Sequence, residues 1–114
     1  MRIKRGDIVL VNLEPVLGSE QGKTRPCLVL QNDIGNATSP TTIVAAITSV
    51  TEKEYPFTVF LPEGEANLPK DSTVLLNQLR TVSINDRIIK KIGTVPASRM
   101  IRVNQAVKIS LALD

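Results

Sequence analysis

The sequence predicts a mainly β fold, a small barrel of five or six short strands closed by one C-terminal helix. Two observations support this fold class. Short apolar runs of β-forming residues recur along the chain, and Gly, Pro, Asn and Ser gather between them. Only the last part of the chain, residues 96–113, repeats apolar residues at helical spacing. With 114 residues, we expect a single domain over residues 1–114.

The strands are expected where apolar β-forming residues are bounded by turn residues. Residues 7–13 end at Glu14-Pro15, which is a stop signal. Residues 26–30 are apolar at consecutive positions, so this strand should be buried on both faces. The full set of expected strands is 7–13, 26–30, 42–48, 57–61, 72–76 and 88–94.

The segments between these strands are expected to be irregular. Residues 16–24 carry Gly18 and Gly22 among polar residues, which predicts a long exposed loop. Residues 32–40 are rich in Asn, Ser and Pro and predict a second loop, and the polar residues 77–86 should connect the last two strands.

One amphipathic helix is expected over residues 96–113. Pro96 suits a first helical turn. The apolar stripe consists of Met100, Val103, Val107 and Leu111, widened by Ile101 and Ile109. A domain of this size with so many continuous apolar strands should bury further surface in a dimer.

The absence of certain residue types excludes several kinds of site. The chain has no histidine, which excludes a Ser-His-Asp triad, a paired-histidine nuclease and histidine-ligated zinc. The single cysteine, Cys27, excludes an internal disulfide and an all-thiolate zinc site. A phosphate loop of the Walker type is also excluded, because the earlier glycine is replaced by Leu17. Charged catalytic groups would therefore come mainly from Arg, Lys, Asp and Glu.

Charge and hydropathy bear on partners and location. The net charge of +3 and the pI near 9.3 are compatible with a phosphate-bearing partner. No apolar stretch is long enough to span a bilayer, and the N-terminus lacks a signal-peptide core. We therefore expect a cytoplasmic protein without a membrane partner.

Arg25 is the first candidate for chemistry, because it lies where an exposed loop enters an apolar strand. Pro26 forces Arg25 into an extended backbone, so the direction of its side chain is fixed. A guanidinium held in this way matches a phosphate and stays charged at any working pH. The alternative is an ordinary surface arginine whose stem covers apolar surface.

Other polar residues form further candidates, each with an ordinary structural alternative. Thr48 and Ser49 end the third expected strand, where hydroxyl groups either satisfy turn backbone or donate to a phosphate. Glu20 is the carboxylate nearest to Arg25 in sequence, either a solvated loop residue or a proton-transfer group. Gln78 and Arg80 form a second polar cluster that could equally be surface loop.

Five motifs occur in the order that they take in one known family. They are Arg5-Gly6-Asp7-Ile8-Val9, Gly18-Ser19-Glu20-Gln21-Gly22-Lys23-Thr24-Arg25-Pro26, Thr48-Ser49, Gln78-Leu79-Arg80-Thr81 and Gly93-Thr94-Val95-Pro96. In these motifs the chain resembles the MazF/PemK (Kid) family of toxin endoribonucleases. The resemblance covers essentially the whole chain.

This resemblance implies an SH3-like β-barrel with a C-terminal helix, assembled as a homodimer. Members of the family are toxins that cut single-stranded mRNA at short sequences without a metal or other cofactor. They leave 2′,3′-cyclic phosphate and 5′-hydroxyl ends, and a cognate antitoxin protein holds them inactive. By motif position, the family's essential arginine and threonine fall on Arg25 and Thr48.

The expected chemistry needs no nucleophile from the protein, because a ribose 2′-OH attacks its own 3′ phosphate. Glu20 is the candidate that assists this hydroxyl, and Arg25 could instead act as the acid toward the leaving 5′ oxygen. Some relatives use a catalytic aspartate near the position of Ser83, or a histidine. This chain has Ser83 near that position and no histidine, which favours a catalytic site built on Arg25 and Thr48. Contacts to RNA are expected from Ser19, Gln21, Lys23, Ser49, Gln78 and Arg80.

Two other functions fit the same fold class. A gyrase poison of the CcdB type acts through a C-terminal Trp-Gly-Ile ending, whereas this chain has no tryptophan. A plain RNA-binding barrel would use aromatic stacking platforms, for which only Tyr55, Phe57 and Phe60 are available. The choice of RNA sequence should depend on the loops at residues 16–24 and 50–56.

Overall fold

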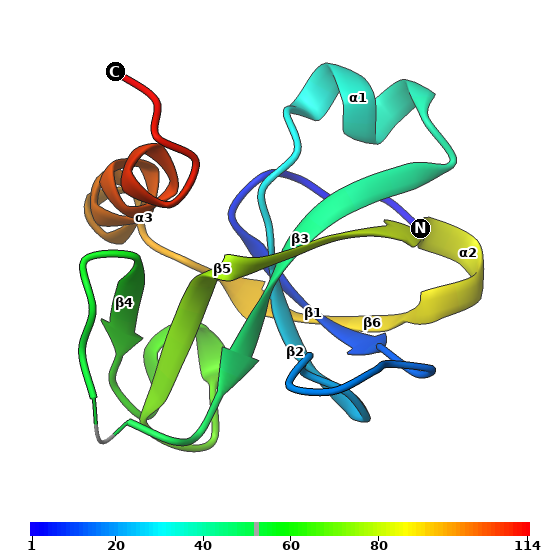
Figure 1. Cartoon of the computed structure of the whole chain (residues 1–114). Helices are drawn as coiled ribbons and strands as arrows, with labels where there is room; N and C mark the ends of the chain where they lie inside the picture. The colour runs from blue at the N-terminus through cyan, green and yellow to red at the C-terminus, as the bar shows by residue number, and fades with distance from the viewer. Residues whose placement is uncertain (52) are drawn as a thin grey trace.

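The computed structural model describes residues 1–51 and 53–114, and in these residues six antiparallel strands form one sheet (Figure 1). Their order along the sheet is β4-β5-β3-β2-β1-β6. The strands are β1 (Asp7–Asn12), β2 (Thr24–Val29), β3 (Thr41–Thr48), β4 (Thr58–Leu61), β5 (Ser72–Ser83) and β6 (Ile88–Thr94). The expected six strands and mainly β fold class are confirmed.

The helices occupy the connections and the C-terminus. They are α1 (Asp33–Thr38), the 3-10 turn η1 (Glu65–Asn67), α2 (Ile84–Arg87) and α3 (Ala97–Ser110). The expected C-terminal helix is confirmed, and α3 packs against β4 and β5 (Figure 1). In the part of the chain that the structure describes, no helix is both long and apolar enough to cross a bilayer.

The sheet curls, but its two edges do not meet. Within residues 1–51 and 53–114, no ladder joins β4 to β6. The expected barrel is therefore open, and α3 packs at the side where β4 lies. An open sheet covered in this way still encloses a core, because the curvature and the helix together keep water from its apolar residues.

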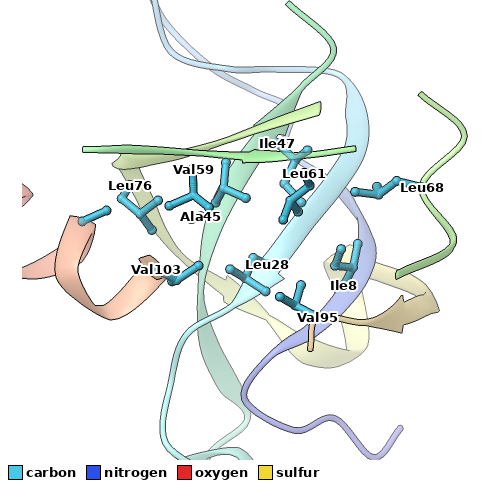
Figure 2. Close-up of a cluster of buried hydrophobic side chains, with 12 residues drawn as sticks. Ile8, Leu28, Ala45, Ile47, Val59, Leu61, Leu68, Leu76, Val95 and Val103 are labelled. Atoms are coloured by element: carbon cyan, nitrogen blue, oxygen red, sulfur yellow. The ribbon is translucent and has the colours of Figure 1, made fainter. Parts of the chain in front are cut away.

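The strands at the centre of the sheet are buried on both faces, as the continuous apolar run in β2 predicts. Leu28 and Ala45 pack into a first cluster that includes Val103 of α3 (Figure 2). Cys27 and Ala46 alternate with them and belong to a second cluster on the other side of the sheet. Consecutive residues of a strand point to opposite faces, so a strand between two cores must be apolar throughout.

One expected loop is partly helical. Residues 33–38 form α1, whereas residues 32–40 were predicted to be irregular. The helix begins at Asn32, whose side-chain Oδ1 accepts a hydrogen bond from the Gly35 N–H at 2.8 Å. Asn is common both in turns and at helix N-caps, so the composition of this segment does not distinguish the two.

The prediction that the fifth strand stops at residue 76 is wrong. β5 continues to Ser83, and the polar residues 77–83 belong to it. The ladder with β3 changes register abruptly, because Ala45 pairs with Leu79 whereas Ala46 pairs with Leu75. Residues 76–78 are thus extra residues in β5, and they form a bulge that interrupts the apolar pattern without ending the strand.

Leu28 provides a test of the first cluster. Replacing Leu28 with Ala should lower the free energy of unfolding by about 2–5 kcal/mol, because the residue is fully buried and leaves a cavity. The matched control is Leu17→Ala, whose side chain is 82% exposed and which should change stability by less than about 0.5 kcal/mol. Urea denaturation at one protein concentration measures both, and equal effects would contradict this core.

Cys27 provides a test of the second cluster. Burial raises the pKa of its thiol to about 12, although the positive charges of Arg25 and Arg80 act in the opposite direction. The folded protein should therefore resist alkylation by iodoacetamide near pH 9.0, where an ordinary cysteine is about half ionised. Unfolding in urea should expose the thiol to rapid labelling, which mass spectrometry can follow.

The same shift has a consequence for stability. Above pH 9.0, the unfolded chain loses the thiol proton while the folded chain retains it, so stability should fall as the pH rises. Rapid alkylation of the native protein, at the rate of the unfolded chain, would contradict the burial of Cys27.

Candidate functional site

The register of the sheet brings Arg25 and Thr48 level with each other. Arg25 is the second residue of β2, and Thr48 is the last residue of β3. These strands pair antiparallel with Cys27 opposite Ala46, and continuing that register by two residues puts Arg25 opposite Thr48. Because side chains alternate along a strand, both residues project to the side of the sheet that carries Cys27 and Ala46.

Backbone contacts orient both side chains. The Nε of Arg25 donates to the carbonyl oxygen of Gly22 at 2.8 Å, and the side chain remains partly exposed. This bond uses one of the five N–H groups of the guanidinium. The Oγ1 of Thr48 accepts from the Val50 N–H at 3.2 Å, a role that does not use the hydroxyl hydrogen. Each residue therefore keeps donor capacity while its position is fixed.

Arg80 brings a second positive charge to the same side. It lies on β5 opposite Val44 of β3, and its Nη1 donates to the carbonyl oxygen of Leu13. The charges of Arg25 and Arg80 both lower the pKa of the buried Cys27 thiol, against the larger effect of burial. Two guanidinium groups from different strands therefore lie around one buried group, and together they make this side of the sheet positive.

The loop between β1 and β2 is closed by hydrogen bonds at its base. The Leu13 N–H donates to the Lys23 carbonyl at 2.9 Å, and the Lys23 N–H donates to the Glu14 carboxylate. Lys23 has a φ of 63°, a left-handed conformation that a non-glycine residue holds only with such support. From α2, Arg87 donates to the carbonyl of Asn12 at 3.1 Å and to that of Glu14.

Glu20 lies at the tip of this loop. Its Oε1 accepts from the Leu17 N–H at 2.7 Å, and its side chain is exposed. Among the described residues, no ion pair within 4.0 Å joins Glu20 to Arg25. The structure therefore shows no ion pair between Glu20 and Arg25, although they are five residues apart in sequence. In this conformation the Glu20 carboxylate instead closes its own loop through the Leu17 N–H.

Two hollows lie side by side under this loop. The first has a volume of about 340 Å³, and Glu20, Gln21, Gln78 and Arg80 are among its lining residues. The second has a volume of about 500 Å³ and is lined by Gln21, Thr48 and Gln78 among others. Gln21 and Gln78 belong to both, and the Gln21 N–H donates to Gln78 Oε1 at 3.4 Å. This contact ties the loop to the bulge of β5.

The remaining expected residues lie at the surface around these hollows. Ser19 and Lys23 are exposed in the β1–β2 loop, and Ser49 is exposed just after β3. Within the described part of the chain, none of these three residues lines either hollow. The other loop expected to choose the RNA sequence, residues 50–56, includes Glu52, which lies outside the described residues.

Sequence reasoning did not assign a place in the site to an aromatic pair. Tyr55 and Phe57 line the larger hollow, and their rings are stacked with centroids 5.1 Å apart and planes 6° from parallel. Tyr55 and Phe57 are two residues apart, which predicts that they lie on the same face of an extended chain but does not predict that their rings stack. Arg87 was also missed as an anchor of the loop, because nothing in its local sequence points to residues 73 or more positions away.

The combined arrangement can bind an anion at the rim and a flat group in the hollow. Positive charges from Arg25 and Arg80 and a hydroxyl from Thr48 suit a phosphate, while amides and aromatic rings suit a heterocycle. In residues 1–51 and 53–114, no three Cys, Asp or Glu side chains gather in a way that could hold a metal ion.

Comparisons with known proteins assign the chain to a family. A family model described as the PemK-like, MazF-like toxin of type II toxin-antitoxin systems matches residues 4–111. A protein of Bacillus subtilis strain 168 named Endoribonuclease EndoA is 46% identical over 114 residues, which cover 99% of this chain and 97% of that protein.

Solved structures of the same kind share the fold. The crystal structure of MazF (Form-I) from Deinococcus radiodurans matches with a TM-score of 0.85 and 28% identity over 99% of each chain. A chain in the MazE-MazF crystal structure (Form-III) from that organism matches with a TM-score of 0.78 and 26% identity over 100% of each chain. From the extent of the family match and the identity to its relatives, the chain belongs to the PemK-like, MazF-like toxin family of type II toxin-antitoxin systems.

Proposed function

We propose that residues 1–114 form one toxin domain, a sequence-specific endoribonuclease that cleaves single-stranded mRNA without a metal. The observation that carries this proposal is the placement of Arg25 and Thr48 opposite each other on adjacent strands, where Thr48 also lines the larger hollow. The B. subtilis relative carries the name of an endoribonuclease, which supports RNA as the substrate.

The reaction is a transesterification within the RNA. The 2′ oxygen forms a bond to the adjacent phosphorus and loses its proton, and the bond from phosphorus to the 5′ oxygen breaks. The leaving 5′ oxygen gains a proton, so the products are a 2′,3′-cyclic phosphate and a 5′-hydroxyl. DNA is not cleaved, because it lacks the 2′-OH.

Arg25 and Thr48 stabilise the charge that builds on the phosphate oxygens during this reaction. The guanidinium of Arg25 is fixed through Gly22, so it can face the phosphate without reorganising. Thr48 donates its hydroxyl hydrogen to one oxygen while Val50 holds the Oγ1 in place. Arg80 adds positive charge from β5 on the same side of the sheet, and a guanidinium there attracts the phosphate electrostatically.

The proton of the 2′-OH is taken by Glu20 in this proposal. The carboxylate lies on the loop that lines the smaller hollow with Gln21, Gln78 and Arg80. To act as base it must exchange its contact with the Leu17 N–H for the substrate hydroxyl, which apo geometries often require. The alternative in which Arg25 protonates the leaving oxygen is compatible with this role.

The other contacts to RNA come from residues around the hollows. Gln21 and Gln78 offer amide groups at the junction of the two hollows, and amides can read the edge of a base. Ser19, Lys23 and Ser49 are exposed at the rim, where they can reach phosphate or ribose oxygens.

The partners follow from the family. A structure of MazE with MazF exists for the D. radiodurans proteins, and we propose that a cognate antitoxin binds this chain as well. A disordered acidic segment that orders on binding would complement the positive charges on this side of the sheet. We further propose a homodimer in the cytoplasm, where mRNA is found.

Replacing Arg25 with Ala should lower the rate of RNA cleavage by a factor of about 10²–10³, the usual cost of losing one electrostatic donor to the transition state. The protein should stay folded, because the guanidinium lies at the edge and not in either cluster. Arg2→Ala is the matched control, since it removes the same charge from an exposed position. Single-turnover cleavage of a long RNA and far-UV circular dichroism give the two readouts. If Arg25→Ala cut RNA as fast as the parent protein, Arg25 would not have the proposed role in stabilising the phosphate.

The substitution Glu20→Gln distinguishes between two roles of Glu20, as the general base or as a contact that closes the loop. Glutamine keeps an oxygen that can accept from the Leu17 N–H, but it cannot take a proton from the ribose. If Glu20 is the base, cleavage should slow by a factor of about 10²–10⁴, and the pH dependence on the acid side should disappear. Cleavage near the parent rate in Glu20→Gln, together with slow cleavage in Glu20→Ala, would assign the residue to loop closure instead.

A further inference from the structure

The larger hollow is lined by two aromatic side chains that the phosphate chemistry does not use. Tyr55 and Phe57 lie along it with their rings stacked at 5.1 Å and 6°. Tyr55 is 47% exposed and Phe57 is partly exposed. Neither residue belongs to the two core clusters, so this pair is not needed to fill the interior.

The backbone holds this pair in place before any ligand binds. The Tyr55 N–H donates to Thr58 Oγ1 at 3.0 Å, and that hydroxyl donates back to the Tyr55 carbonyl at 3.0 Å. The Thr58 N–H also donates to the Tyr55 carbonyl, and the Leu76 N–H donates to the Phe57 carbonyl. The pair is thus attached to β4 and to the bulge of β5, and a preorganised surface costs less to use in binding.

The walls of the hollow carry groups that recognise a heterocyclic edge. Side-chain amides come from Gln21, Asn77 and Gln78, and a positive charge comes from Lys53. An amide offers both donors and an acceptor, which is what the edge of a nucleobase requires. The volume of about 500 Å³ lies within the usual range of small-molecule sites.

Resting on the proposed function, we propose that this hollow binds one nucleobase of the RNA, stacked on the Tyr55–Phe57 pair, next to the scissile phosphate. Thr48 lines the hollow and also lies level with Arg25, so the bound base belongs to a nucleotide that adjoins that phosphate. The aromatic pair supplies affinity through stacking, and the amides of Gln21, Asn77 and Gln78 select among bases at their edges.

The chain contains its own reporter for this contact. Tyr55 is the single tyrosine, and there is no tryptophan, so intrinsic fluorescence comes from this residue. A base stacked on the pair should quench it. The probe is a mixed-sequence, eight-nucleotide 2′-O-methyl RNA, which cannot be cleaved because its 2′ oxygen has no proton to lose. Stacking on aromatic residues tolerates any base, so the recognised sequence need not be known.

Four variants isolate the contribution of stacking to affinity, which fluorescence anisotropy of end-labelled RNA measures. Tyr55→Leu and Phe57→Leu should weaken binding roughly five- to hundredfold, as expected for the loss of one base–aromatic stack. Tyr55→Phe keeps the ring and should bind within about twofold of the parent protein. Phe60→Leu makes the same change as Phe57→Leu at a residue of β4 that does not line this hollow, and it should also bind normally.

Each outcome decides the proposal. Quenching of Tyr55 together with weaker binding by Tyr55→Leu and Phe57→Leu supports the subsite. RNA that saturates the protein by anisotropy, with unchanged tyrosine emission and unchanged affinity in both variants, overturns the subsite alone and leaves the surface to another partner such as the antitoxin. No binding of this RNA by a protein that still cleaves a long RNA overturns the subsite alone, whereas neither binding nor cleavage overturns the proposed function together with the subsite.

Discussion

The pairing of β2 with β3 is the contact on which the site depends. These two strands are buried on both faces, and Cys27 lies opposite Ala46 where the two cores are separated only by the sheet. A shift of one residue would turn every side chain to the other face and would exchange Leu28 with Cys27, which fill different clusters. The register is therefore held by how well these side chains fill the two cores, because both faces of the strands are apolar. The same register fixes Arg25 and Thr48 two residues further on. The positions of Arg25 and Thr48 therefore depend on the packing of the buried apolar residues in the same two strands.

The arginines of the site serve the backbone as well as any ligand. Arg25 donates to Gly22, Arg80 to Leu13, and Arg87 to Asn12 and Glu14. All of these acceptors lie in or next to the β1–β2 loop. A carbonyl oxygen is a weaker partner for a guanidinium than a carboxylate. The positive charge of these residues thus remains uncompensated by ion pairs in the described part of the chain, and it can still attract an anion.

Much of this organisation could be predicted from the sequence. The apolar runs gave the strands, and the helical stripe gave α3, because both depend on local periodicity. The importance of Arg25 and Thr48 was also visible, through Pro26 and through the motifs of the family. The course of β5 was missed because its bulge interrupts the apolar pattern. α1 was missed because Asn32 suits both a turn and a cap.

The parts of the site that could not be predicted depend on the folded chain. Glu20 is close to Arg25 in sequence, yet its carboxylate turns to the Leu17 N–H at the tip of the loop. The stacking of Tyr55 on Phe57 depends on side-chain rotation, and the anchoring by Arg87 crosses most of the chain. Sequence patterns report the face on which a residue lies. They do not report which of several neighbours on that face it will contact.

The bulge at residues 76–78 changes which residues of β5 face the side of the sheet that carries Ala46. Before it, Thr73 and Leu75 lie on that side, and after it Arg80 and Val82 do, because an odd number of extra residues inverts the alternation. β5 therefore presents side chains to the two hollows both before the bulge and after it. The length of this short segment is therefore as informative as its composition. A related chain that lost one of these three residues would have to change either the size of the bulge or the face of the sheet to which the equivalent of Arg80 points.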